Sequence, residues 1–209
     1  MVQQPSLYPI QFSVEYPDRP LDRFSSFFRI IAIIPISIVL GLVTGGNFGE
    51  EDAQIVGGLM GGLVFFAPLL MILFRRKYPR WWFDWNIGLM KFENRVTAYL
   101  FLLRDEYPST DEEQTVHLEV PYPDVEGDLN QWLPLVKWFL AIPHYIVLAV
   151  LSLVLIVVVI VVWFVILFSR RYPRSLFDFV VGVMRWYNRV IAYAFILATD
   201  RYPPFSFSP

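Results

Sequence analysis

The sequence predicts an α-helical integral membrane protein built from two tandem repeats, each with a short cytoplasmic strand, a transmembrane helical hairpin and an amphipathic interfacial helix. The first reason is composition: 56% of the 209 residues are hydrophobic and 17% are charged, whereas roughly a quarter of the residues in soluble domains are charged. The second is that the apolar residues form runs long enough to cross a bilayer. The third is that one sequence segment occurs twice.

The repeated segment covers residues 74–103 and 168–197, and more than half of its paired positions are identical. Both copies contain F-x-R-[KR]-Y-P-R-x-x-F-D followed by G-x-M-[KR]-x-x-N-R-V-x-A-Y. Each copy follows a long apolar run and begins with a cluster of basic residues. We therefore divide the chain into a first membrane repeat, residues 1–110, and a second membrane repeat, residues 111–209.

A short strand is predicted near the start of each repeat. Residues 8–18 and 115–124 alternate apolar and polar side chains, and both segments end in Tyr-Pro-Asp. Alternation of this kind predicts a strand with one buried face. Because a short strand is not stable alone in water, we expect the two to pair with each other, with residues 205–207 beside them.

The first repeat contains two predicted spans. The N-terminal segment lacks the basic and apolar regions of a signal peptide, so we expect the run at residues 24–44 to remain as a membrane anchor, with Arg29 reaching the lipid head groups. An acidic turn at residues 45–54 leads to a second run at residues 55–74. Two overlapping small-xxx-small patterns that favour close helix packing are formed in this run by Gly57, Gly58, Gly61 and Gly62.

The apolar run of the second repeat, residues 132–168, is too long for one upright span. As a single helix it would be roughly 55 Å long, against a hydrocarbon core of about 30 Å. Alignment with the first repeat indicates that most of the polar turn is missing, so we expect two short helices that turn near Ser152. The alternative is one tilted span from His144 to Phe168, following an interfacial helix broken at Pro143.

The basic clusters predict the orientation, because Lys and Arg favour cytoplasmic flanks. With two hairpins, both clusters and both termini lie in the cytoplasm, and residues 81–103 and 176–197 form amphipathic helices in the membrane interface. The alternative is six spans with inverted halves, which would place one cluster outside. The clusters either fix the orientation only or also bind anionic head groups, and the candidates for head-group binding are Arg75, Arg76, Arg80, Arg170, Arg171 and Arg174.

Polar residues also recur at corresponding positions of the two repeats. Asp84 and Asp178 suggest a shared acid–base or ion site, but each follows an arginine by four residues near a helix start, where a negative charge suits the helix dipole. The helix-start role is favoured. An Asn-Arg pair recurs as well, and we expect polar contacts between the repeats, with a ligand or partner site on their pseudo-two-fold axis as the alternative. The residues expected in these contacts are Asp84, Asn94, Arg95, Asp178, Asn188 and Arg189.

His144 is an ionisable residue in an apolar segment, which makes it a candidate cofactor ligand. Its counterpart in the first repeat is Ile36, so no symmetric histidine pair exists. The chain has no cysteine, and it contains no phosphate-binding loop and no G-x-S-x-G or H-E-x-x-H motif. We therefore expect no metal, no cofactor and no enzymatic activity. Because the basic residues lie at the membrane edge, nucleic-acid binding is not expected either.

The recurring F-x-x-R-Y-P-R-x-x-F-D-F, N-R-V-x-A-Y and L-A-I-P-H-Y pieces resemble a bacterial family of small polytopic membrane proteins catalogued as a domain of unknown function. The resemblance covers nearly the whole chain, although the first repeat has residues 31–36 (IAIIPI) in place of L-A-I-P-H-Y. It implies a location in the bacterial cytoplasmic (inner) membrane. It transfers no activity and no catalytic residue.

These features predict a non-enzymatic integral membrane scaffold or accessory subunit that binds a larger membrane complex, anionic lipid or both. The expected partners are membrane lipids and either another membrane protein or further copies of the chain. The alternative is a small transporter or channel component with its pathway between the repeats, because internal repeats are common in transporters. A lipid-modifying enzyme that uses Asp84 and Asp178 is the least favoured class.

Overall fold

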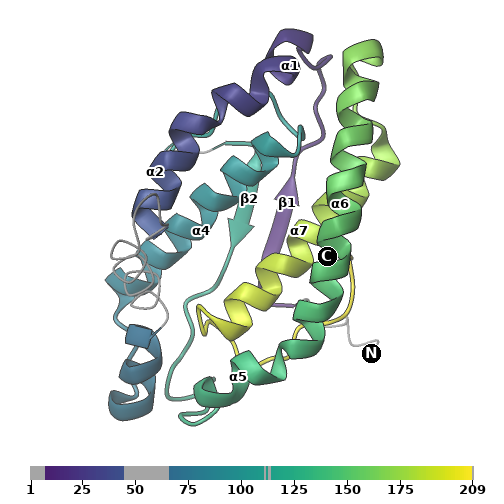
Figure 1. Ribbon diagram of the computed structural model, residues 1–209. Helices are drawn as coiled ribbons and strands as arrows, with labels where there is room; N and C mark the ends of the chain where they lie inside the picture. The colour runs from purple at the N-terminus through teal and green to yellow at the C-terminus, as the bar shows by residue number, and fades with distance from the viewer. Residues whose placement is uncertain (1–7, 45–65, 111, 113, 209) are drawn as a thin grey trace, which may run out of the picture.

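The computed structural model describes residues 8–44, 66–110, 112 and 114–208 (Figure 1). Helices dominate this part of the chain, as the sequence predicts, and a two-stranded sheet accompanies them. In chain order the elements are β1 (Gln11–Val14), α1 (Arg23–Ala32), α2 (Ile34–Thr44), a helix at Phe66–Arg75, α4 (Arg80–Leu100), β2 (Val116–Glu119), α5 (Pro134–Leu140), α6 (Ile142–Ser169) and α7 (Arg174–Ala194).

The two strands pair with each other in antiparallel fashion, as their shared alternation predicts. Phe12 lies opposite Leu118, and both side chains are buried. The polar residues of the other face, such as His117 and Glu119, are exposed. Residues 205–207 do not join the sheet, contrary to the prediction; instead the Phe207 ring packs against Phe179 and Trp186 of α7.

The amphipathic helices α4 and α7 lie between the sheet and the remaining helices. β1 packs on α7 and β2 packs on α4, so each strand contacts the long amphipathic helix of the other repeat. Both helices start directly after the proline of a Tyr-Pro-Arg sequence, Pro79 or Pro173. A proline cannot continue a preceding helix, so it separates each amphipathic helix from the apolar helix before it.

The outer layer consists of α1, α2, α5 and α6. α2 packs on α4, α6 packs on α7, and α1 reaches across to α6 (Figure 1). α1 and α2 follow one another with a bend of 41° at Ile33. The molecule is therefore layered: the sheet, then α4 and α7, then the apolar helices.

The hairpin predicted near Ser152 is wrong, because α6 is one continuous helix of 28 residues. The Ser152 hydroxyl donates to the Leu148 carbonyl one turn back, at 2.8 Å. After Pro143, which lies in the first turn of α6, the segment contains no glycine or proline, so nothing in it ends the helix. The alternative of one long helix after a short helix, broken close to Pro143, matches the structure.

Two tandem transmembrane hairpins are therefore not supported. α6 is long and apolar enough to cross a membrane, α1 with α2 would pass the same test as one bent span, and the apolar helix at Phe66–Arg75 is shorter. The acidic turn at residues 45–54 lies outside the described residues. The same holds for the glycines that the sequence assigns to helix packing, which are Gly57, Gly58, Gly61 and Gly62.

Arg29 does not reach outward to the lipid head groups, as predicted, but points into the protein. Its side chain is 2% exposed, and its guanidinium forms an ion pair with Asp105 and donates to the carbonyls of Tyr99 and Arg104, both at 2.9 Å. Asp105 is close to Arg29 only in the folded chain, which is why the sequence pattern misses this contact. An unpaired buried guanidinium would be costly, so this pair fastens α1 to the end of α4.

Lys137 of α5 occupies the corresponding position in the second repeat. It is fully buried, its ammonium lies 2.6 Å from a carboxylate oxygen of Asp200, and it donates to the Thr199 carbonyl at 2.7 Å. Burial lowers the pKa of Lys137, and the neighbouring Asp200 opposes that shift. One buried ion pair thus attaches α1 to the segment after α4, and another attaches α5 to the segment after α7.

Candidate functional site

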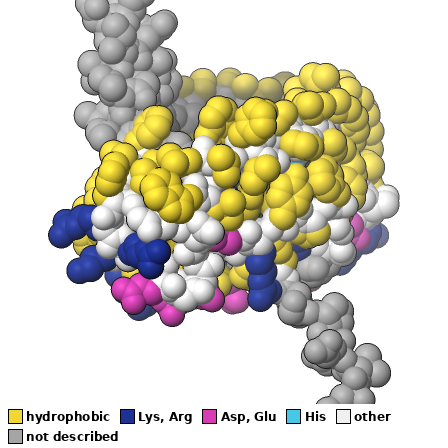
Figure 2. All heavy atoms as spheres, turned by 90° about the horizontal axis from the view of Figure 1, so that it is seen from below, with side chains coloured by type: hydrophobic (Ala, Val, Ile, Leu, Met, Phe, Trp, Pro, Cys, Tyr) yellow, Lys and Arg dark blue, Asp and Glu magenta, His cyan; other side chains and the backbone are white. Residues whose placement is uncertain are grey.

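The outer layer presents an apolar face. Of α6, one stripe is buried, formed by His144, Leu148, Leu155, Val162 and Ile166. Most of its other large apolar side chains, among them Leu153 and Phe168, are exposed. Figure 2 shows hydrophobic side chains gathered along one side of the molecule and charged side chains along the opposite side. A contiguous apolar surface of this kind marks an interaction site.

Exposed tryptophans accompany the apolar face. Trp81 and Trp85 lie in the first two turns of α4, and Trp132 and Trp138 lie just before and within α5. Tryptophan is enriched where hydrocarbon meets head groups, because its ring is apolar and its N–H is a donor. The Trp138 N–H is already bonded to the Leu135 carbonyl, at 2.7 Å.

The arginines proposed to bind head groups lie exposed at two places, each just after an apolar helix. Arg80 and Arg174 form ion pairs with the aspartates one turn later, at 3.8 Å to Asp84 and 3.2 Å to Asp178. Exposed pairs of this spacing contribute little to stability, so both guanidinium groups remain able to meet an external anion. The other four, also exposed, are Arg75, Arg76, Arg170 and Arg171.

Each Tyr-Pro-Asp turn packs on the arginine segment of the other repeat. The Arg174 guanidinium lies 4.7 Å from the ring centre of Tyr16, and the Arg80 guanidinium lies 5.3 Å from that of Tyr122. The Tyr16 hydroxyl donates to the Tyr172 carbonyl, and the Tyr122 hydroxyl donates to the Tyr78 carbonyl. These stacks hold the two guanidinium groups in place, and the recurrence of both motifs was the only sequence signal for them.

A cleft of about 680 Å³ adjoins the first arginine group. Its cations are Arg76, Lys77 and Arg80, and its acids are Asp124 and Glu126. The Arg76 side chain is held there by a 2.9 Å bond to the Gln131 amide oxygen. Open space beside three cations suits a phosphate-containing head group better than a neutral ligand.

Asn94 and Asn188 meet where α4 and α7 face each other. Each amide donates to the side-chain oxygen of the other at 2.7 Å, and each also donates to a backbone carbonyl one turn back in its own helix. Both side chains are buried. The reciprocal bonds join corresponding positions of the two repeats, so a pseudo-two-fold axis that relates the repeats would pass between the two asparagines.

The other polar residues expected between the repeats have separate environments. Asp84 and Asp178 are exposed and contact arginines of their own helices, so the contacts between repeats predicted for them are not formed, and neither is a shared acid–base site. Arg95 donates to the Ser109 carbonyl at 2.8 Å, within the first repeat. Arg189 donates to the Ser208 carbonyl at 2.7 Å and stacks over the ring of Tyr8 from the first repeat.

His144 is buried in an aromatic cluster. Its Nδ1 accepts a hydrogen bond from the Trp186 N–H at 3.0 Å, and its ring stacks on Phe205 with centres 4.0 Å apart. In the described part of the chain, no group of His, Asp and Glu side chains has a metal-binding arrangement. His144 therefore acts in packing α6 against α7 and the C-terminal segment.

A cavity of about 220 Å³ lies beside the asparagine pair, between α4, α6 and α7. Its lining is mainly apolar, but it includes Glu93 and Tyr187, which correspond in the two repeats. Burial raises the pKa of Glu93. The sequence around Glu93 carries no signal of this setting, because only the fold places the carboxyl among apolar side chains.

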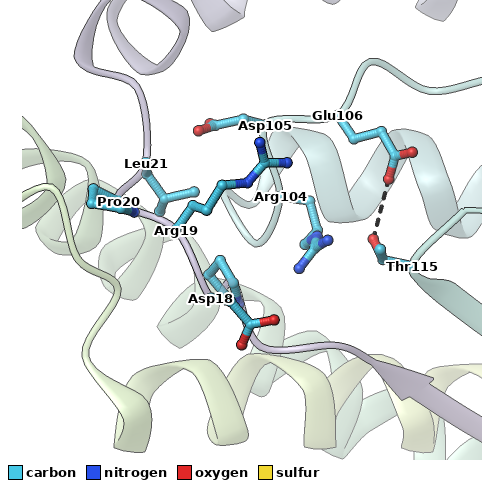
Figure 3. A pocket seen from close by; sticks show the side chains of 9 residues that line it. Asp18, Arg19, Pro20, Leu21, Arg104, Asp105, Glu106 and Thr115 are labelled. Atoms are coloured by element: carbon cyan, nitrogen blue, oxygen red, sulfur yellow. Dashed lines mark hydrogen bonds between the residues drawn. The ribbon is translucent and has the colours of Figure 1, made fainter.

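A second, polar cleft of about 650 Å³ lies beside the first Tyr-Pro-Asp turn (Figure 3). Acidic and basic side chains alternate around it, with Asp18, Asp105 and Glu106 facing Arg19 and Arg104. Glu106 also accepts a bond from the Thr115 hydroxyl at 3.3 Å. One of these acids, Asp105, is already paired with Arg29, and the cleft carries charges of both signs.

Comparison with known proteins identifies one part of the chain. Residues 134–206 match the family model described as "Domain of unknown function (DUF4389)". This segment runs from α5 through α7 to the C-terminal tail, and it supports the resemblance to a domain of unknown function. No curated protein and no solved structure matches the chain.

Proposed function

We propose that the chain is a non-enzymatic membrane scaffold or accessory protein that binds anionic lipid and offers a docking surface to another membrane component. The observation that carries the proposal is the apolar outer layer with exposed arginines next to it. Hydrocarbon would cover the apolar side chains, and phosphate groups would neutralise the arginines. Asp84 and Asp178 are each paired with an arginine of their own helix rather than with each other, which favours this class over an enzyme.

We further propose that the protein resides in the bacterial cytoplasmic membrane, with both arginine groups on the cytoplasmic side. The multi-pass topology expected from the sequence needed two hairpins. With α6 as a single crossing, one arginine group would lie outside, against the preference of arginine for the cytoplasmic face. The transporter alternative is weakened by the small, mainly apolar cavity beside the asparagine pair.

Gentle native extraction of the tagged protein, followed by mass spectrometry of what accompanies it, tests this function. We expect the protein to partition with membranes and to retain anionic lipid or a stoichiometric membrane-protein partner. A protein recovered from the soluble fraction without lipid would contradict the proposal. A mock extraction from cells that lack the tagged chain identifies adventitious partners.

A further inference from the structure

We propose that the outer layer lies flat in one anionic leaflet, with α6 parallel to the membrane plane, so that the described part of the chain enters the membrane without crossing it. This inference rests on the proposed function, because it assumes that the apolar face meets lipid. The partner of the outer layer is then the hydrocarbon and the phosphate groups of a single leaflet. For the described part of the chain, insertion from the cytoplasmic side only replaces the multi-pass arrangement.

α6 packs on α7 and is held by neighbouring helices near both of its ends. His144 contacts α7 near one end of α6, and the Trp163 N–H donates to the Ser26 carbonyl of α1 near the other, at 3.0 Å. α7 in turn carries β1 on its other side, where Arg185 donates to the Phe12 carbonyl at 3.0 Å. If α6 stood upright in the membrane, α7 and the sheet would stand beside it at the same depth.

The sheet cannot be placed at that depth without a large cost. Its outward face carries Glu15, His117 and Glu119, all exposed, with Glu15 and His117 3.3 Å apart. In the described part of the chain the sheet has only two strands, so each strand is an edge strand. Charged side chains and open strand edges are not tolerated against lipid. A flat orientation places the apolar helices in the leaflet and leaves the sheet in water.

The depth of the two arginine groups also favours the flat orientation. Corresponding positions of the repeats meet at Phe12 and Leu118 in the sheet and at Asn94 and Asn188 between the helices. A two-fold axis through both contacts crosses the layers, so the segments that it relates lie at equal depth. In Figure 1 the C-terminal end of α6 and the helix at Phe66–Arg75 lie at opposite ends of the molecule. Only the flat orientation brings both arginine groups to one membrane surface.

The dimensions of the outer layer fit a single leaflet. One layer of helices is roughly 10 Å thick, which fits within a single leaflet of about 15 Å, half of the hydrocarbon core. α6, at 28 residues, is longer than an upright span requires, since a helix of that length extends about 42 Å. The thickness of the hydrocarbon core does not restrict the length of a helix that lies parallel to the membrane plane.

Two single-cysteine variants test the inference, because the chain contains no cysteine of its own. Glu126→Cys lies before α5 and Ser175→Cys lies just after α6, and both positions are exposed. A membrane-impermeant maleimide added to intact cells should label neither variant, and it should label both after lysis. Labelling of one of them from outside would show a crossing and overturn the inference.

Depth measurements complete the test, because a helical hairpin inserted into the membrane would also keep both cysteine positions on the cytoplasmic side. Spin labels at Ile146→Cys, Leu153→Cys and Ile160→Cys, all exposed positions on α6, should report similar depths in vesicles of phosphatidylglycerol and phosphatidylcholine. A depth that peaks at residue 153 and falls on both sides would contradict a flat helix. If the protein does not associate with vesicles at all, the proposed function fails as well; a crossing overturns only the orientation.

Discussion

At the scale of single residues, the structure is organised by a few buried polar contacts in an otherwise apolar chain. The asparagine pair is the clearest, because each of its amides is satisfied by the other and by a backbone carbonyl. Buried polar groups that satisfy one another specify a single arrangement of the elements that carry them. This pair therefore fixes how α4 and α7 lie against each other.

Asn94→Ala should destabilise the protein by about 1–3 kcal/mol, because the Asn188 amide stays buried but loses its hydrogen bonds to the Asn94 side chain. The double variant Asn94→Ala/Asn188→Ala should cost little more than the single one. Thermal unfolding in lipid nanodiscs measures both. Strictly additive losses would show that the two amides do not depend on each other.

Glu93 makes stability depend on pH. Burial raises its pKa above the ordinary 4.5, so the folded protein binds this proton more tightly than the unfolded chain does. Stability from this group is complete below pH 4.5 and is lost as the pH rises through the folded pKa. Glu93→Gln should remove that loss and raise the melting temperature at pH 7 relative to wild type.

The control for this experiment is Glu119→Gln on the exposed face of β2, where removal of the charge should change little. Melting temperatures of the three proteins between pH 4.5 and pH 8 provide the comparison. A wild-type curve parallel to that of Glu93→Gln over this range would mean that the carboxyl is not held in an apolar setting.

At the scale of elements, α6 decides the architecture. Ser152→Pro places a proline in the middle of a continuous helix, where it removes a backbone hydrogen bond and clashes with the preceding turn. The expected cost is about 3 kcal/mol or more. A turn of a hairpin would accept the same proline. Expression and thermal unfolding, with Ser152→Ala as the control, distinguish the two, and an unchanged stability of the proline variant would argue for a turn.

The elements also show what the sequence could and could not predict. Strand pairing was predictable, because alternation leaves Phe12 and Leu118 on one buried face. The two amphipathic helices were predictable from the repeated segment. The hairpin prediction failed because it relied on the alignment with the first repeat, whereas residues 144–169 contain no glycine or proline that would end a helix. The burial of Arg29 and Lys137 depends on Asp105 and Asp200, which only the folded chain brings near them.

The candidate site was predictable to a similar extent. The arginine groups could be found from their position after the apolar runs, and the asparagines from their recurrence. The stacking of Arg80 and Arg174 on tyrosines of the opposite repeat requires knowledge of how the two halves pack. Glu93 carried no local signal at all, since its counterpart in the second repeat is Tyr187.

At the scale of the whole molecule, the three layers separate apolar from polar surface. α4 and α7 join the two repeats; in the proposed arrangement the outer helices would contact hydrocarbon and the sheet would face water. The arginines stand next to the apolar layer, so the same surface combines apolar burial with attraction to negative charge. We therefore propose that this surface binds membranes and prefers anionic lipid.

Flotation of the purified protein with vesicles tests that claim most directly. Wild type should float with vesicles that contain phosphatidylglycerol, and Arg170→Gln/Arg171→Gln/Arg174→Gln should weaken the binding on the order of 100-fold, at about 1 kcal/mol for each charge. The control variant Arg19→Gln/Lys91→Gln/Arg201→Gln removes three exposed charges outside the arginine groups and should change binding less. A wild-type protein that stays soluble and monomeric, and does not float with either neutral or anionic vesicles, would contradict the account.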